Sequence, residues 1–360
     1  MDAAAVGWLG LKGVAVAAVP LAYVFFSHDP AKFRKLAWVT AFLTLDLIMV
    51  GSFTRLTDSG LGCPDWPGCY GHSNPVSAGE PIRAAETAQP TGPVTMTKAW
   101  IEMLHRYFAM GVGFLIIILT VQAWRRPRRD GLPSPWFATA ALAWVCLQGA
   151  FGALTVTMKL QPIIVTAHLL GGMVLLALLV ALAMREGGSL TPAYETQSLR
   201  TLKRVALLVV VVQVALGGWV SSNYAVLACP DFPRCQGAWV PTMDLEHGFT
   251  LWRGLGRTGG GDMIPFPALV AIHWVHRTFA VVATGVLVAL VLYMRRLEGP
   301  TPISRWIAAV LVLQLATGLS NVVLEWPLLA AVLHSGGAAV LVALLSALNL
   351  RAGSKVLTGR

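Results

Sequence analysis

The sequence predicts an all-α membrane protein that crosses the bilayer nine times, and three observations lead to this class. Of the 360 residues, 56% are hydrophobic and only 12% are charged, and the mean hydropathy is +0.66. The apolar residues gather in long runs, and the same order of landmarks occurs twice along the chain. Such a chain is typical of a polytopic membrane protein and not of a soluble globule.

Nine apolar runs are long enough to cross a hydrocarbon layer of about 30 Å. No small-residue cleavage site follows the first run, so we expect it to stay as an anchor; an uncleaved signal-like segment is the alternative. In chain order, the predicted helices cover residues 7–26, 37–54, 99–122, 135–156, 163–184, 204–222, 268–294, 306–324 and 329–350.

Basic residues between these helices predict how the chain is oriented. With the N-terminus outside, the inner connections and the C-terminal tail hold 17 of the 27 Lys and Arg residues, whereas the outer segments hold seven. The positive-inside rule therefore places the N-terminus outside and the C-terminus in the cytoplasm, in a bacterial cytoplasmic membrane. The net charge of +10 orients the protein in its lipid bilayer, and we expect no nucleic-acid partner.

The second to fifth helices and the sixth to ninth helices form two copies of one arrangement. Four helices per copy is an even number, so both copies enter the membrane from the same side, and the repeat is parallel. We expect an extra N-terminal helix with its linker at 1–36, one four-helix bundle at 37–184 and a second at 204–350. The paired landmarks are Cys63 with Cys229, Cys69 with Cys235, and Gln148 with Gln314.

Four histidines lie inside predicted helices, His105 and His168 in the first copy and His276 and His334 in the second. At ~1.5 Å per residue, all of them sit roughly 10 Å inside the outer hydrocarbon boundary. An imidazole at this depth is costly unless it binds something, and two pairs on non-adjacent helices suit two haem irons. A hydrogen-bonded structural histidine is the alternative, and zinc is disfavoured because no Cys or carboxylate completes a ligand set.

Charged residues near these histidines extend the candidate sites. Arg106 and Arg277 each follow a histidine, and they either neutralise haem propionates or extend to the lipid headgroups. Glu102 shares a helix face with the first histidine of its copy, whereas the matching position in the second copy is His273. A carboxylate inside a membrane marks function by default, so Glu102 is a candidate for proton transfer or substrate orientation, with a salt bridge to Arg106 as the alternative. Asp46 is either a structural hydrogen-bonding residue or part of a proton path.

Two long connections, residues 55–98 and 223–267, lie outside, and each carries two cysteines separated by five residues. Thiols on that side of the membrane can oxidise and persist as disulfides. The pairs Cys63–Cys69 and Cys229–Cys235 either close small structural rings or are reactive, and the prolines between them favour a rigid closed turn.

Six segments carry a family resemblance. They are GSFTRLTDSGLGCPDWPGCYG, EMLHRYFAMGVG, LQGAFGALTV, AHLLGG, HWVHRTFA and LHSGGA. Together and in this order they resemble the haem A synthases of bacteria and mitochondria, over residues from about 38 to 350. The resemblance implies an oxidoreductase of haem A biosynthesis, a branch of porphyrin biosynthesis. Such an enzyme converts the C8 methyl of haem O to a formyl group by successive hydroxylations.

The resemblance also implies roles for individual residues. His276 and His334 would ligate a resident haem b iron, and His105 and His168 would frame the haem O substrate, with Glu102 as the key carboxylate. The paired cysteines correspond to loop cysteines of one subgroup, for which both structural and redox roles have been proposed. The first helix departs from the family's common eight-helix pattern.

Partners and rival functions complete the expectations. We expect a haem O synthase to deliver haem O, and an electron donor that the sequence does not identify. The sequence leaves open whether the protein forms a homo-oligomer. A dihaem b-type electron-transfer cytochrome without substrate turnover is the alternative, and Glu102, present in one copy only, argues against it. A parallel-repeat transporter ranks last, because the helices are unbroken and the histidines lie off-centre.

Overall fold

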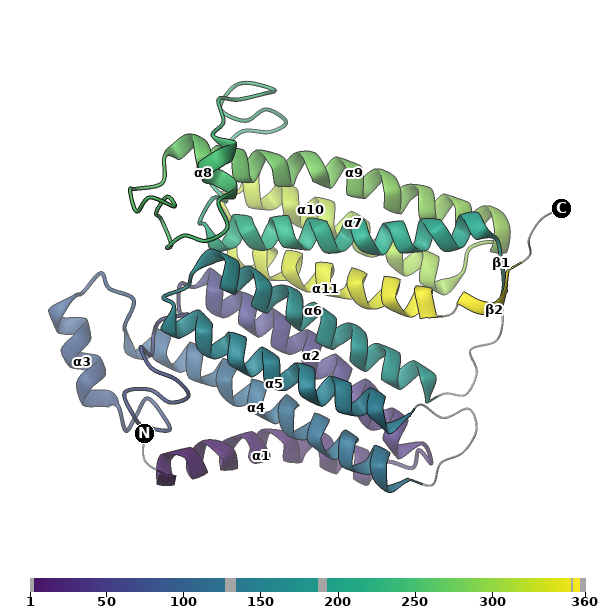
Figure 1. Ribbon diagram of the computed structural model, residues 1–360, viewed down its shortest axis with the longest axis horizontal. Coiled ribbons are helices and arrows are strands. Elements are labelled where there is room, and N and C mark those ends of the chain that lie inside the picture. Colours follow the sequence, from purple (N-terminus) through teal and green to yellow (C-terminus); the bar gives the residue numbers. More distant parts are fainter. Residues whose placement is uncertain (1–2, 127–133, 187–192, 351, 357–360) are drawn as a thin grey trace. The chain divides into compact units, whose positions relative to one another are not determined.

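The computed structural model of the protein describes residues 3–126, 134–186, 193–350 and 352–356 (Figure 1). In these ranges, nine helices are long and apolar enough to cross a membrane, which confirms the predicted fold class. Four of the basic residues counted for the inner side, Arg128, Arg129, Arg351 and Arg360, lie outside the described ranges. The nine helices are α1 (Ala3–Phe25), α2 (Lys32–Leu56), α4 (Met96–Arg125), α5 (Pro135–Thr157), α6 (Pro162–Arg185), α7 (Gln197–Ser222), α9 (Phe266–Glu298), α10 (Pro302–Val323) and α11 (Leu328–Leu350).

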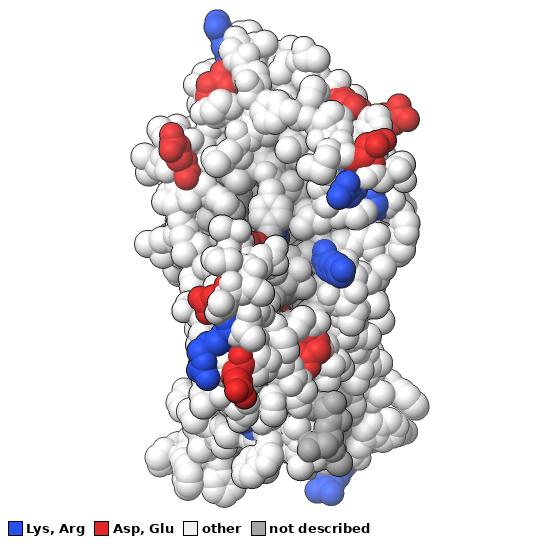
Figure 2. All heavy atoms as spheres, turned by 90° about the vertical axis from the view of Figure 1, so that its left-hand side faces the viewer, with Lys and Arg blue, Asp and Glu red and all other residues white. Residues whose placement is uncertain are grey.

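Short elements lie between the long helices. Helix α3 (Gly79–Ala88) and helix α8 (Leu245–Phe249) interrupt the two long connections, and neither was predicted. Two short strands, β1 (Ala193–Glu195) and β2 (Ala352–Val356), pair in parallel. Acidic and basic side chains are scattered over a mostly uncharged surface on the face shown in Figure 2.

Local sequence signals set where several helices begin. The Thr95 hydroxyl accepts a hydrogen bond from the backbone N–H of Lys98 and caps α4, and Thr196 caps α7 in the same way. Helix α10 combines a Thr301 cap with a proline at its first turn. A side-chain oxygen at the cap satisfies a backbone donor that the helix leaves free, and proline there has no donor to lose.

The chain divides into two compact units. The first contains Met1–Leu160 and Val174–Gly188, and the second contains Gln161–Met173 and Ser189–Arg360. Helix α6 contributes its beginning to the second unit and its remainder to the first. The predicted bundle boundaries at 37–184 and 204–350, and the parallel repeat itself, stay predictions.

In the first unit, α4 packs against α1, α2 and α5. Glycines let α1 and α4 approach closely: a Cβ atom on Gly111 would lie 2.5 Å from Cγ1 of Val16, and one on Gly13 would lie 2.8 Å from Cβ of Met110. Small residues at such crossings allow backbones to meet and gain van der Waals contact. The extra N-terminal helix is therefore packed into the first unit along α4.

In the second unit, four long helices form a closed ring. Helix α7 packs against α9 and α11, and α10 packs against the same two helices. Neither α9 with α11 nor α7 with α10 packs closely in the described part of the unit. Helices α9 and α11 therefore occupy opposite corners of the ring.

Candidate functional site

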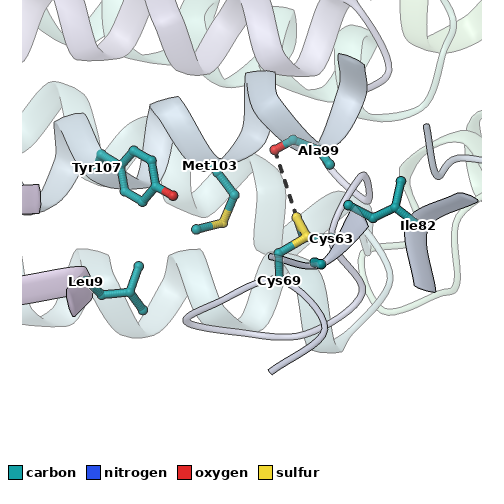
Figure 3. Packing of buried hydrophobic residues seen from close by; sticks show 8 residues of the cluster. Leu9, Cys63, Cys69, Ile82, Ala99, Met103 and Tyr107 are labelled. Carbon is teal, nitrogen blue, oxygen red and sulfur yellow. Dashed lines mark hydrogen bonds between the residues drawn. A yellow bond between two sulfur atoms is a disulfide. The ribbon is translucent and has the colours of Figure 1, made fainter. Parts of the chain in front are cut away.

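Both long connections fold around a cysteine pair. We name residues 57–95 cysteine loop 1 and residues 223–265 cysteine loop 2. Disulfides join Cys63 to Cys69 and Cys229 to Cys235, with Cα atoms 4.9 and 4.6 Å apart, as the spacing predicted. In cysteine loop 1, the disulfide packs against Ala99, Met103 and other buried residues of the first unit (Figure 3).

An aspartate closes each loop by accepting two backbone hydrogen bonds. In cysteine loop 1, the Asp65 carboxylate accepts from the N–H groups of Tyr70 and Gly71, at 2.6 and 2.7 Å. In cysteine loop 2, Asp231 accepts from Gln236 and Gly237, at 2.8 and 2.9 Å. The Gly237 N–H, then that of Gln236 and the positive charge of Arg277, hold the pKa of the Asp231 carboxyl below its ordinary value.

Glu102 of α4 is buried, with 3% of its surface exposed, and both of its carboxylate oxygens are engaged. One oxygen accepts a hydrogen bond from the backbone N–H of Cys63 at 2.8 Å, and the other accepts from Nη2 of Arg106 at 2.5 Å. The salt bridge that the sequence left as the alternative is therefore present. Its geometry ties the candidate acid directly to the first cysteine of cysteine loop 1.

Arg106 holds the rest of that loop. Its Nη1 donates to the carbonyl oxygens of Asp65 at 2.9 Å, Pro67 at 3.3 Å and Gly68 at 2.5 Å. One helix turn thus supplies both the acceptor for the loop's N–H and the donor for its carbonyls. Contact between Arg106 and a haem propionate stays a prediction.

The second unit repeats this arrangement with one change of residue. His273 is 4% exposed, and its Nδ1 accepts a hydrogen bond from the backbone N–H of Cys229 at 3.3 Å. Nη2 of Arg277 donates to the carbonyls of Asp231 at 2.9 Å and Arg234 at 3.3 Å. Nη1 of Arg277 is buried and has no hydrogen-bond partner among the described residues. His273 therefore occupies the structural position that Glu102 has in the first unit.

His276 lies on α9, and α7 supports it. Nε2 of Gln213 lies 3.2 Å from Nδ1 of His276 and donates to the His276 carbonyl at 3.3 Å. A Cβ atom on Gly217 would lie 3.0 Å from Cε1 of His276, so the ring is seated against the bare backbone of α7. The imidazole of His276 also lies within electrostatic range of His334.

His334 lies on α11, at the opposite corner of the ring, and α10 supports it. The Thr317 hydroxyl lies 3.0 Å from Nδ1 of His334, and Nε2 of Gln314 donates to the His334 carbonyl at 2.9 Å. A Cβ atom on Gly318 would lie 3.2 Å from Cε1 of the ring. The second unit therefore brings together the two histidines of the predicted C-terminal pair.

Of the N-terminal pair, His105 belongs to the first unit and His168 to the second. His105 lies against α2, where a Cβ atom on Gly51 would be 2.9 Å from its Cε1. His168 belongs to the part of α6 that groups with the second unit, and its buried Nδ1 has no hydrogen-bond partner among the described residues. The pairing of His105 with His168 stays a prediction. Asp46 is half-buried in α2, and both of its predicted roles remain open.

The seating of the histidine rings on glycines was not predicted from the sequence. Gly51, Gly217 and Gly318 each face an imidazole. In α7 and α10 this glycine follows a glutamine by four residues, which gives the pairs Gln213–Gly217 and Gln314–Gly318. That spacing places both residues on one helix face, and it was the signal available in the sequence. The adjacent Gly218 instead serves helix packing, because a Cβ atom there would lie 2.9 Å from Leu169.

The fold and these sites define a class, a multi-pass helical membrane protein in which neighbouring helices seat half-buried histidines and disulfides close the two long loops. Residues 34–346 match the family COX15-CtaA, described as cytochrome oxidase assembly protein. The chain belongs to this family, as the resemblance predicted. Helix α1 precedes the matched region.

Individual relatives are similar over most of their length. The chain is 38% identical to the protein named Heme A synthase of Shewanella oneidensis over 320 residues, which cover 88% of this chain and 96% of the relative. It is 28% identical to the Heme A synthase of Sphingopyxis alaskensis, over 91% of this chain and 93% of the relative. It is 30% identical to that of Methylobacterium radiotolerans, over 84% of each.

Proposed function

We propose that the protein is a haem A synthase, an oxidoreductase that converts the C8 methyl of haem O to a formyl group by successive hydroxylations. The observation that carries this proposal is the placement of His276 and His334 on opposite corners of one helix ring, each seated by the helix beside it. Similarity to relatives named Heme A synthase over nearly their whole length supports the same conclusion.

The second unit fits a haem b held by two histidines. Gly217 and Gly318 keep the space beside each imidazole free of side chains, and a methyl group at either position would press on the ring. The buried Nη1 of Arg277, which has no partner in the described part of the chain, is a donor suited to a propionate. We propose that His276 and His334 are the iron ligands and that Arg277 contacts a propionate. When bound, haem b supplies one-electron chemistry.

We assign the haem O substrate to His105 and His168, with Glu102 beside them. A carboxylate offers about four lone-pair positions, and Glu102 uses one on the Cys63 N–H and one on Arg106. The backbone N–H of Gly62 also donates to this carboxylate, and the carboxylate would orient a hydroxyl group on the substrate or take a proton at an Oε atom. Arg106 holds the carboxylate in position through its hydrogen bond.

The setting of the enzyme follows from the same proposal. We place it in a bacterial cytoplasmic membrane, with the N-terminus and both cysteine loops outside and the C-terminus in the cytoplasm. A haem O synthase would deliver the substrate, and a separate donor would supply electrons. The cysteine pairs would serve as structural ring closures or as a redox couple. The protein would act as a monomer or as a homo-oligomer.

A dihaem b-type electron-transfer cytochrome is the second candidate. The support that α7 and α10 give to the histidines of the second unit would serve electron transfer equally well. The two candidates differ in whether a haem is chemically changed.

Haem extraction and chromatography separate them. The protein is expressed with and without a haem O synthase, and its haems are extracted and identified. We expect haem A, or its hydroxylated precursor, only when the synthase is present. Haem B alone under both conditions, in a well-folded protein, would overturn the enzyme proposal and favour the cytochrome.

A further inference from the structure

The Thr317 hydroxyl connects α10 to the imidazole of His334. Its Oγ1 lies 2.7 Å from the carbonyl oxygen of Leu313 and 3.3 Å from that of Gln314, and it lies 3.0 Å from Nδ1 of His334. A carbonyl oxygen can only accept, so the single hydroxyl proton is donated along α10. The hydroxyl oxygen must then accept a hydrogen bond, and its donor is Nδ1–H of His334.

This direction decides the tautomer of the imidazole. A neutral histidine carries one N–H and one bare nitrogen, so a proton on Nδ1 leaves the lone pair on Nε2. A metal-bound histidine almost always donates its other N–H to an oxygen, which fixes the ring and raises the basicity of the ligand. Thr317 supplies that oxygen within the protein.

We propose that Thr317 is a positioning residue that fixes His334 in the tautomer able to bind haem iron through Nε2 and makes it a more basic ligand. The inference rests on the proposed role of His334 as a haem b ligand. Thr317 would contact the histidine ligand and not the haem itself.

The remaining contacts of α10 restrict the same ring. Gln314 donates a hydrogen bond to the His334 carbonyl. Gly337 leaves room for the Gln314 side chain, because a Cβ atom on Gly337 would lie 2.2 Å from Nε2 of Gln314. Gly318 borders Cε1 of the imidazole. Gln314, Thr317 and Gly318 share one face of α10. Together they fix the backbone, the ring position and the tautomer of the ligand.

The first half of the chain lacks this support. One offset of 166 residues relates Cys63 to Cys229 and His168 to His334, and it places Phe151 at the position of Thr317. Phenylalanine cannot accept a hydrogen bond, and Nδ1 of His168 has no partner among the described residues. The contrast suits a haem that is retained at His334 and a haem that must leave as product at His168.

The test uses the full-length protein, purified with its haem b. Thr317→Val removes the acceptor and keeps the shape, and Thr317→Ser restores the hydroxyl. Thr44→Val is the matched control, because the Thr44 hydroxyl makes the same bond to a carbonyl of its own helix, Thr40 at 2.8 Å. The measurements are the midpoint potential of haem b and the rate of haem transfer to apomyoglobin.

We expect Thr317→Val to weaken haem b binding about 10- to 100-fold and to raise its midpoint potential, because a less basic ligand stabilises ferric iron less. Thr317→Ser and Thr44→Val should match the wild type. If valine prevents folding, Thr317→Ala provides the same test. Wild-type potential and retention in a folded Val or Ala variant would overturn the positioning role. Unchanged haem b in His334→Ala would instead overturn the ligand assignment, and with it this part of the proposed function.

Discussion

Glu102 in the first unit and His273 in the second accept the same hydrogen bond, from the backbone N–H of the first cysteine in the adjoining loop. In both units an arginine one turn further along the helix binds loop carbonyls. Holding the loop therefore requires an acceptor but no particular charge. The carboxyl group of Glu102 is what the first unit has in addition, and we propose that the reaction uses it.

The largest expected effect separates these two acceptors. Glu102→Gln keeps an oxygen that can accept from Cys63 but loses the charge, so we expect haem A formation to fall by about 10²- to 10⁴-fold. Haem b content should not change. His273→Gln, the matched variant, should leave haem A formation within a few fold of the wild type. Chromatography of extracted haems measures both, and full activity in Glu102→Gln would remove its role in the reaction.

The next effect concerns the glycines that seat the rings. Gly217→Ala places a methyl group 3.0 Å from Cε1 of His276. Crowding of this kind costs about 1–3 kcal/mol, or roughly 5- to 150-fold in haem b affinity. Gly149→Ala is the control, since a Cβ atom there meets nothing within 4 Å. Haem b content per protein, from pyridine haemochrome spectra, gives the result. Equal haem b content in Gly217→Ala and Gly149→Ala would show that the position of the His276 ring does not affect haem b binding.

The two disulfides sharpen the comparison because their rings have the same length. Each closes a separation of six residues, so replacing either pair by serine should destabilise the protein by about 2–3 kcal/mol. Thermal unfolding of Cys63→Ser/Cys69→Ser and of the matching double variant in cysteine loop 2 measures this. If both pairs are structural, the two variants should lose stability and turnover in parallel. Selective loss of turnover with the first pair alone would indicate redox chemistry there.

The smallest effect is on the pH dependence of cysteine loop 2. The Gly237 N–H lowers the pKa of Asp231 in the folded protein. The stabilisation is therefore complete above the ordinary aspartate pKa of about 4 and is lost as the pH falls through the lower folded value. Hydrogen exchange of the Gly237 amide should show faster opening of the loop below about pH 4. Asp231→Asn should show little pH dependence, and an equally pH-dependent amide in that variant would exclude Asp231 as the cause.

Much of the site could be predicted from the sequence because its signals are local. The spacing of Cys63 and Cys69 was enough to predict their disulfide, and the C-terminal histidines were identified from their matched places in the chain. The hydrogen bond from the Cys63 N–H to Glu102 was not predicted, because it joins residues far apart in the chain, and the salt bridge to Arg106 was left as the alternative to a functional role. The contact of Gly217 and Gly318 with the imidazoles was not predicted, because glycine is common in membrane helices for other reasons.

The sequence by itself determined the nine membrane helices, the two disulfide rings and the family, since each depends on apolar length, short spacing or the order of motifs. Only the tertiary structure decided which side chains meet. The contact of Glu102 with Cys63 spans 39 residues, and that of His273 with Cys229 spans 44. Such contacts depend on the rotation of each helix about its axis, which packing against its neighbours sets. Apolar composition on all sides of these helices leaves that rotation undetermined until the bundle is assembled.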